Sequence, residues 1–326
     1  MPFHRTRLPL RNAQISGSFV CHKNIYLGHT SDTIRHSWLR RWSLLNSTME
    51  SRYNPITFRL PINESVTIAR PKILCFVPYL PNHPYLCEAI QSIADQTFRP
   101  DLVVIAIDQG ELVSNADLFQ SSWLSEISRI LPLEIRVFDG LNGPYKMLNQ
   151  VVLDYPGFTH LWLQDSDDFS HPTRLARQIS FMDTYNLEMC SCFELRLRKS
   201  SLQLVDYPVH ATRALMSEPG HCMLWPASLI KITIWNKLKG CSDAFRFGAD
   251  TEFQLRACFT ARMANYPSYL YARRIRSDSL TGSSETGHKS WQRGYINSLY
   301  KADYYRRQML REAGEKLSLS PRFRTT

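Results

Sequence analysis

Short β-branched and aliphatic runs alternate with amphipathic segments from Lys72 onward, and this alternation restricts the fold more than any other feature. The runs have the length of strands, and the segments between them carry apolar residues at helical spacing. This alternation is typical of βαβ units in a mostly parallel sheet, so the expected fold class is α/β. The expected strands are residues 73–77, 102–107, 133–138 and 159–164, and the expected helices are residues 85–96, 119–130 and 145–153. The long runs 189–197 and 263–273 indicate a second half that is not simple βαβ.

Three carboxylates, Asp165, Asp167 and Asp168, directly follow the fourth expected strand. The carboxyl ends of strands in such a sheet face the ligand crevice, so we expect these acids to point into a binding site. Like charges this close raise each other's pKa unless a cation neutralises them. Mn²⁺ and Mg²⁺ prefer hard oxygen ligands, and Mg²⁺ usually keeps positions for water and substrate phosphate. The pattern therefore predicts a divalent cation and a nucleotide diphosphate.

Helix capping is the alternative interpretation of these acids. Asp168, Ser170 or Thr173 would suit the N-cap of a helix beginning near Arg174. A cap needs one acid and three are present, which favours the metal site.

Composition excludes several classes of protein. The chain has 326 residues, 44% of them hydrophobic, enough for one large core or two modest ones. No run approaches the roughly 20 apolar residues that span a bilayer, and the first twenty residues do not form a secretory core, so we expect a cytoplasmic protein. The eight cysteines form no CxxC pair, which favours buried free thiols.

The net charge of +10 is concentrated at the two ends. Residues 1–52 hold eight Lys/Arg against two Asp/Glu, and residues 301–326 hold seven against three. The neutral middle argues against a specific nucleic-acid-binding face. A helix over residues 35–45 would place Trp38, Trp42 and Leu45 on one face flanked by arginines, which suits the anionic inner face of a membrane. We expect either this peripheral contact through the basic ends or an ordinary helix packed on the domain.

Six ordered segments between Lys72 and Tyr304 together fit one known pattern. They are residues 77–97, 105–108, 143–149, 165–168, 248–256 and 274–281, and the two acidic segments among them are the most specific. This part of the chain resembles family-2 glycosyltransferases of the GT-A fold. The resemblance implies a mostly parallel central sheet flanked by helices, with a Rossmann-like nucleotide-binding half and a mixed acceptor-binding half.

The resemblance also implies a domain division. Residues 1–66 form a basic extension, residues 67–310 the glycosyltransferase domain, and residues 311–326 a basic tail. Within the domain, residues 67–187 are the nucleotide-sugar half and residues 188–310 the acceptor half.

Donor-side roles follow by position from the same resemblance. Asp167 and Asp168 are the expected ligands of Mn²⁺ or Mg²⁺, and Asp165 is expected to bind the ribose hydroxyls. The other expected nucleotide or phosphate contacts are Pro78, Tyr79, Asp108, Lys146, Arg274 and Arg276. Lys146, Arg274 and Arg276 could equally well be solvated surface charges.

On the acceptor side, Asp250 is the expected general base of an inverting transfer. The glutamate that often precedes this aspartate in the family is Ala249 here, which leaves Glu252 as the second acidic residue. The alternative for Asp250 is a helix N-cap. His221 and Trp225 are expected to line the acceptor groove, although core packing suits Trp225 equally well.

The predicted function is transfer of a sugar from a nucleotide-diphosphate donor, UDP-linked, to a hydroxyl of a saccharide or lipid-linked saccharide, in glycan or polysaccharide biosynthesis. A nucleotidyltransferase is one alternative, but it would need a glycine-rich basic segment where residues 78–84 contain no glycine. A peripheral membrane adaptor with a degenerate transferase fold is the other.

Overall fold

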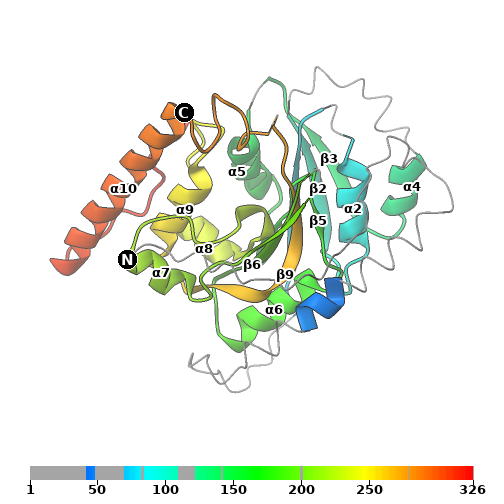
Figure 1. Cartoon of the computed structure of the whole chain (residues 1–326), viewed down its shortest axis with the longest axis horizontal. Helices are drawn as coiled ribbons and strands as arrows, with labels where there is room; N and C mark the ends of the chain where they lie inside the picture. Colours follow the sequence, from blue (N-terminus) through cyan, green and yellow to red (C-terminus); the bar gives the residue numbers. More distant parts are fainter. Residues whose placement is uncertain are drawn as a thin grey trace.

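The computed structural model describes residues 42–47, 70–81, 84–108, 122–140, 142–198, 201–277 and 279–325 (Figure 1). Trp38, which the sequence placed on a possible membrane face, and Asp278, within the family-like segment 274–281, lie outside these residues.

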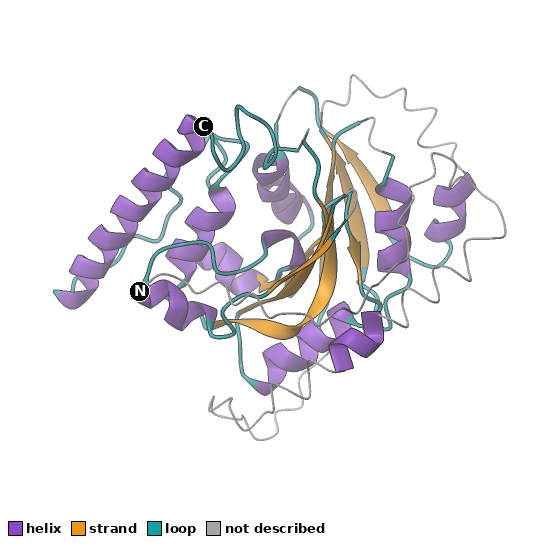
Figure 2. Cartoon of the chain, in the orientation of Figure 1, coloured by secondary structure: helices purple, strands orange, loops and turns teal. Residues whose placement is uncertain are grey.

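One mixed sheet, orange in Figure 2, runs through the molecule. Its nine strands have the order β3-β2-β1-β4-β8-β6-β9-β5, with β7 paired to β6. Strands β1 to β4 are mutually parallel, as expected. Strand β8 is antiparallel to both β4 and β6, and β5 is antiparallel to β9. The strands are β1 Ile73–Tyr79, β2 Leu102–Ile107, β3 Leu133–Val137, β4 His160–Leu163, β5 Phe169–Ser170, β6 Met189–Leu197, β7 Leu202–Val205, β8 Leu229–Lys231 and β9 Met263–Arg274.

Helices cover both faces of this sheet. Helices α2, α4 and α6 lie on one side of it in Figure 1, and α5, α8, α9 and α10 lie on the other. The bounds are α2 Leu86–Ala94, α4 Ser122–Ser128, α5 Pro144–Asp154, α6 Arg174–Thr184, α7 Ala211–Ser217, η3 Trp225–Ala227, α8 Ile232–Lys237, α9 Ala249–Ala257 and α10 Trp291–Glu312. The expected strands and helices of the first half are confirmed to within a few residues at their ends.

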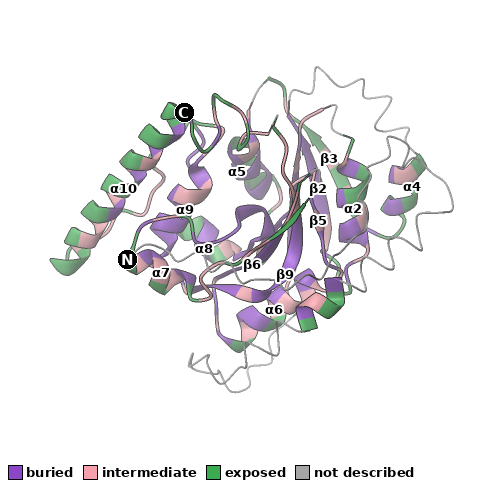
Figure 3. Ribbon diagram, viewed as in Figure 1, coloured by how far each residue is buried: buried purple, intermediate pink, exposed green. Residues whose placement is uncertain are grey.

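Alternation along the strands builds two cores, because successive side chains of a strand point to opposite faces. In β1, Leu74 and Phe76 join the core under α5 and α9. Cys75 and Val77 join the core shared with α2, α4 and α6. The central strands are buried on both faces (Figure 3), which explains why they are apolar throughout and lack alternating polarity.

The cysteines behave as the sequence indicated. Six of the seven described cysteines are buried and free, and only Cys87 is exposed. Among the helices of the described residues, none combines the length and apolar character needed to cross a membrane.

The basic extension contributes structure to the domain. Residues 42–47 form a helical turn, and its Trp42 side chain is only 3% exposed. Trp42 packs with Phe193, Leu195 and Tyr269 of β6 and β9. The membrane-facing orientation expected for Trp42 is therefore wrong, because this indole is removed from water by the sheet of its own domain.

The basic tail also packs on the domain. Leu319 and Phe323 lie against the core beside α9. The Arg256 guanidinium, fully buried in α9, donates to the carbonyl of Leu319 at 3.0 Å and to both carboxylate oxygens of Glu252 at 2.6 and 2.7 Å. This buried pair replaces the acceptor-side role that the sequence predicted for Glu252.

Glu252→Gln should destabilise the protein by about 3–5 kcal/mol, because the change leaves the buried Arg256 charge without its counterion. Chemical denaturation measures this loss. The control is Asp154→Asn, which breaks the more exposed pair with Arg136 and should cost less than about 1 kcal/mol. Equal losses in the two variants would contradict a structural role for the buried pair.

Candidate active site

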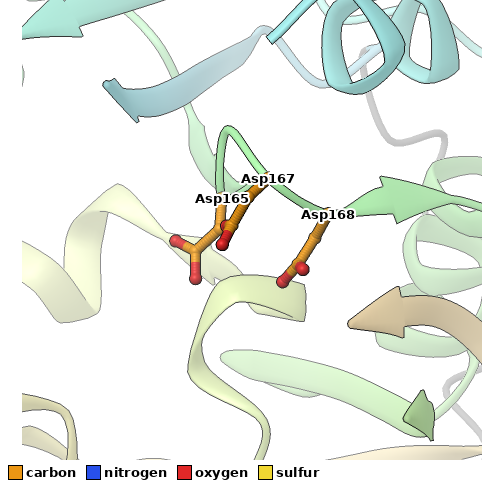
Figure 4. Close-up of side chains that lie close together, drawn as sticks. All are labelled: Asp165, Asp167 and Asp168. Carbon is orange, nitrogen blue, oxygen red and sulfur yellow. The ribbon is translucent and has the colours of Figure 1, made fainter. Parts of the chain in front are cut away.

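Three carboxylates gather on the turn between β4 and β5. One ligand oxygen from each of Asp165, Asp167 and Asp168 lies within 4.8 Å of the others, and the three side chains point to the same side of the turn (Figure 4). Strand β4 lies beside β1 in parallel, with Leu163 opposite Phe76. The turn therefore leaves the carboxyl edge of the parallel strands, where the sequence placed it.

Burial and the neighbouring charges make two of these carboxyls, Asp165 and Asp168, hard to ionise. Burial raises the pKa of Asp165 to about 7, with a further contribution from Asp167 and an opposing one from Arg273. Burial, reinforced by Asp167 and Asp165, raises the pKa of Asp168 well above its ordinary value. A site that destabilises its own negative charge in this way favours a bound cation.

Two arginines at the end of β9, Arg274 as its last residue and Arg276 just beyond it, partly balance the charge of the turn. The backbone N–H of Arg274 donates to Asp168 Oδ1 at 2.8 Å, and its guanidinium donates to the carbonyl of Asp167 at 2.6 Å. Arg276 Nε donates to Asp167 Oδ2 at 2.8 Å. Both were expected near a phosphate, and the structure brings both into contact with the acidic turn.

The three aspartates fit a divalent cation. Asp168 Oδ2 is a buried carboxylate oxygen that lacks a hydrogen-bond partner among the described residues. Leaving such an atom unpaired is costly unless a cation or a proton occupies the position it faces. All the available ligand atoms are carboxylate oxygens, the donor type that Mn²⁺ and Mg²⁺ prefer.

Sequence reasoning missed two residues of β9 that support the acidic turn. The Tyr271 hydroxyl accepts the backbone N–H of Asp165 at 3.1 Å. Arg273 pairs with buried Glu194 at 2.9 Å and interacts electrostatically with Asp165 and Asp168. Tyr271 and Arg273 are two residues apart in one expected strand. This two-residue spacing, ending in a cation, was the sequence signal that could have identified them.

Asp108 lies at the same sheet edge as Pro78 and Tyr79, because β1 and β2 pair in parallel with Tyr79 opposite Ile107. Its buried carboxylate is already engaged, accepting the backbone N–H groups of Asn142 at 2.7 Å and Gly143 at 2.8 Å. Asp108 thus fixes the turn that starts α5. A direct contact between its side chain and a nucleobase stays a prediction, as do the nucleotide contacts of Pro78 and Tyr79.

Asp250 lies in the first turn of α9 beside the acidic turn, close enough that its charge raises the pKa of Asp165. The N-cap of α9 is Gly248, in a left-handed conformation with φ 83°, and the helix has no side-chain cap. The capping alternative for Asp250 is therefore wrong. Its Oδ1 is buried and has no hydrogen-bond partner within the described ranges, and its Oδ2 lies 3.7 Å from His221 Nδ1.

His221 lies next to Asp250 and 3.2 Å from the Thr251 hydroxyl, and its place in an acceptor groove stays a prediction. Burial lowers the pKa of its imidazole, although the neighbouring Asp250 opposes this. The side chain keeps 36% of its surface exposed, so solvent weakens both effects. A neutral imidazole beside an open carboxylate can accept or donate a hydrogen bond to an incoming hydroxyl.

Two residues that the sequence named for the site have other surroundings, Trp225 in the core and Lys146 on the surface. Trp225 is buried between Tyr145 and Phe253, at ring distances of 6.3 and 5.3 Å, which is the core packing that the sequence left open. Lys146 is exposed on α5, and its phosphate contact stays a prediction.

Comparisons with known proteins support the fold. No protein-family model and no curated protein matches the chain. Among solved structures, S. aureus TarS 1–349 in complex with UDP-GlcNAc superposes with a TM-score of 0.54 at 16% identity, covering 70% of this chain and 66% of that one. The same fragment with UDP gives 0.52 at 15% identity, covering 73% and 72%, and a longer TarS structure gives 0.51 at 16% identity, covering 64% and 37%.

The chain has a GT-A glycosyltransferase fold. It spans 66% of the TarS fragment in the first of these structures and little more than a third of the longer chain. At these identities the likeness concerns the fold alone, and membership of family 2 stays a prediction.

Asp108→Asn should lower the free energy of unfolding by about 2 kcal/mol, because the amide replaces one acceptor oxygen with an NH₂ group that faces a backbone N–H. Thermal unfolding without nucleotide measures this loss. A variant with unchanged stability and weakened nucleotide binding would instead assign Asp108 to the nucleobase.

Proposed function

We propose that this protein is a metal-dependent glycosyltransferase that moves a sugar from a nucleoside-diphosphate donor to a hydroxyl acceptor with inversion. The observation that carries the proposal is the cluster of Asp165, Asp167 and Asp168, which suits a cation, with the separate carboxylate of Asp250 near enough for its charge to raise the pKa of Asp165. The carboxylates of the acidic turn and the carboxylate of Asp250 have different surroundings and so suit different roles.

The donor is a nucleotide sugar, and UDP-linked sugars are the first choice. The TarS structure with UDP-GlcNAc supports this choice through the shared fold. Asp167 and Asp168 would hold the divalent cation, with Asp165 directed to the ribose hydroxyls. When bound, the cation supplies positive charge that stabilises the departing diphosphate. Arg274 and Arg276 add fixed positive charge at the same turn.

In the transfer, the acceptor oxygen attacks the anomeric carbon from the face opposite the diphosphate. The new carbon–oxygen bond forms as the bond to the phosphate oxygen breaks, and the nucleoside diphosphate leaves with that electron pair. Asp250 takes the proton of the acceptor hydroxyl. Its side chain keeps 19% of its surface exposed, and its Oδ1 has no hydrogen-bond partner among the described residues, so the carboxylate keeps the capacity to accept a proton.

The acceptor is a saccharide or a lipid-linked saccharide, and the pathway is glycan or polysaccharide biosynthesis. His221 orients the acceptor hydroxyl beside Asp250. A cytoplasmic location stays a prediction, as does membrane contact through the basic ends. The burial of Trp42 removes one residue from the expected membrane face.

UDP should bind at least about tenfold more tightly with Mn²⁺ than with a chelator, since the cation offsets repulsion between carboxylates and diphosphate. Asp167→Asn and Asp168→Asn should each remove this difference in calorimetric titrations. Glu126→Gln, an exposed carboxylate on α4, is the matched control and should keep it. Equal affinity with and without metal in the unmodified protein would reject the metal site.

Asp250→Asn should lower turnover by about 10²- to 10⁴-fold while leaving UDP affinity nearly unchanged, because it removes a proton acceptor and not a donor contact. A screen of nucleotide sugars for metal-dependent hydrolysis first identifies the donor, and transfer assays with saccharide acceptors follow. Collapse of UDP affinity in Asp250→Asn would place this residue in the nucleotide site.

A further inference from the structure

We propose that the helical segment 42–47 is a positioning element for the acidic turn. It holds in place the two strands, β5 and β9, that support the turn. The inference rests on the proposed function, since it concerns the geometry of the cation site. The segment belongs to the extension that the sequence assigned to a membrane role.

The first observation is a triple attachment to the backbone of one residue in β9. Trp42 Nε1 donates to the Tyr269 carbonyl at 2.5 Å, and Asn46 Nδ2 donates to the same oxygen at 2.9 Å. The Tyr269 N–H donates to Asn46 Oδ1 at 2.9 Å. The attachment lies where the β6–β9 register shifts around Phe193, so the segment fixes β9 where its regular ladder is interrupted.

The second observation is contact with β5 and the residue after it. The Trp42 ring meets Phe169 and His171 edge to face, with centroids 5.9 and 5.0 Å apart. Ser43 Oγ is hydrogen-bonded to His171 Nε2 at 3.0 Å. Strand β5 has only two residues and follows Asp168 directly, so it has few ladder bonds of its own to hold it.

Strand β9 is hydrogen-bonded directly to the acidic turn, and β5 continues the chain from it. In β9, Tyr271 accepts the Asp165 N–H, and Arg274 donates its own N–H to Asp168. The Arg274 guanidinium also lies 5.1 Å from the centre of the Phe169 ring, the same ring that Trp42 packs against. The segment contacts Tyr269, Phe169 and His171, so it acts on the turn through the strands that support it.

Support of this kind matters because the three carboxylates repel one another. An unsupported turn would relax by spreading its charges, and the cation would then have to gather its ligands as it binds. Residues 42–47 carry no charge, so their effect on the turn comes from packing and hydrogen bonds. Holding ligands near their bound geometry lowers the cost of binding.

The test compares full-length Trp42→Ala, Trp42→Phe, Asn46→Ala and Ser43→Ala with Phe181→Ala. Phe181 is a buried aromatic residue of α6, packed on Tyr185 and Tyr266, and serves as a matched destabilising control. Each protein is measured for thermal stability, for amide hydrogen exchange in residues 165–174 and 269–274, and for Mn²⁺ affinity without nucleotide.

Trp42→Ala and Asn46→Ala should speed exchange in both segments and weaken Mn²⁺ binding by about 3- to 10-fold, a shift of up to about 1.4 kcal/mol. Trp42→Phe keeps an aromatic ring and should recover part of the affinity. Phe181→Ala should lose stability without either change. If Trp42→Ala does not fold, Asn46→Ala and Ser43→Ala decide the question.

The positioning role is overturned if these variants lose stability as Phe181→Ala does while exchange at the turn and Mn²⁺ affinity stay unchanged. Absence of Mn²⁺ binding in the unmodified protein would be a different result. It would reject the proposed function, and unchanged exchange in the same experiment would separately reject the positioning role.

Discussion

Repulsion among Asp165, Asp167 and Asp168 is the constraint around which this structure is arranged. Three partly or fully buried carboxylates with ligand oxygens within 4.8 Å of one another are unfavourable by themselves, and the raised pKa values of Asp165 and Asp168 express that cost. The surrounding contacts come from distant parts of the sequence. The Arg274 backbone N–H donates to Asp168, the Arg276 guanidinium donates to Asp167, and the Tyr271 hydroxyl accepts the Asp165 backbone N–H. The remaining deficit, an unpaired oxygen of Asp168, is the part that a divalent cation would satisfy.

The second acidic residue of the crevice is held differently. Asp250 lies in the first turn of α9, and the buried ion pair between Glu252 and Arg256 fixes that helix in the core. Arg256 also bonds to the carbonyls of Gly240 and Leu319, which ties the helix to the tail. Glu252 and Asp250 are two residues apart on one helix, so they face in different directions. The Glu252 carboxylate is occupied by its ion pair with Arg256, whereas the Asp250 side chain keeps 19% of its surface exposed.

Much of the site was predictable from local sequence. An apolar strand followed by three acids places those acids at the carboxyl edge of a parallel sheet, and the structure confirms this placement. Arg274 and Arg276 were named only through the family resemblance, and their contacts with the turn depend on the β5–β9 pairing. Tyr271, Arg273 and Glu194 were missed, because burial in a mixed sheet decides which side of a long strand meets the turn. For Trp42 the sequence left membrane contact and packing on the domain open, because an amphipathic helix has the same pattern whether it faces lipid or a neighbouring sheet.

The sequence by itself determined the α/β class, the parallel order of the first strands, the position of the acidic turn and the buried, free state of most cysteines. These properties follow from residue periodicity and from the end of a strand, both of which are local. The tertiary structure alone decided which surface covers Trp42, which cation pairs with Glu252, and which backbone N–H groups donate to Asp108. In each case the deciding contact joins residues far apart in the chain, and burial makes that contact necessary.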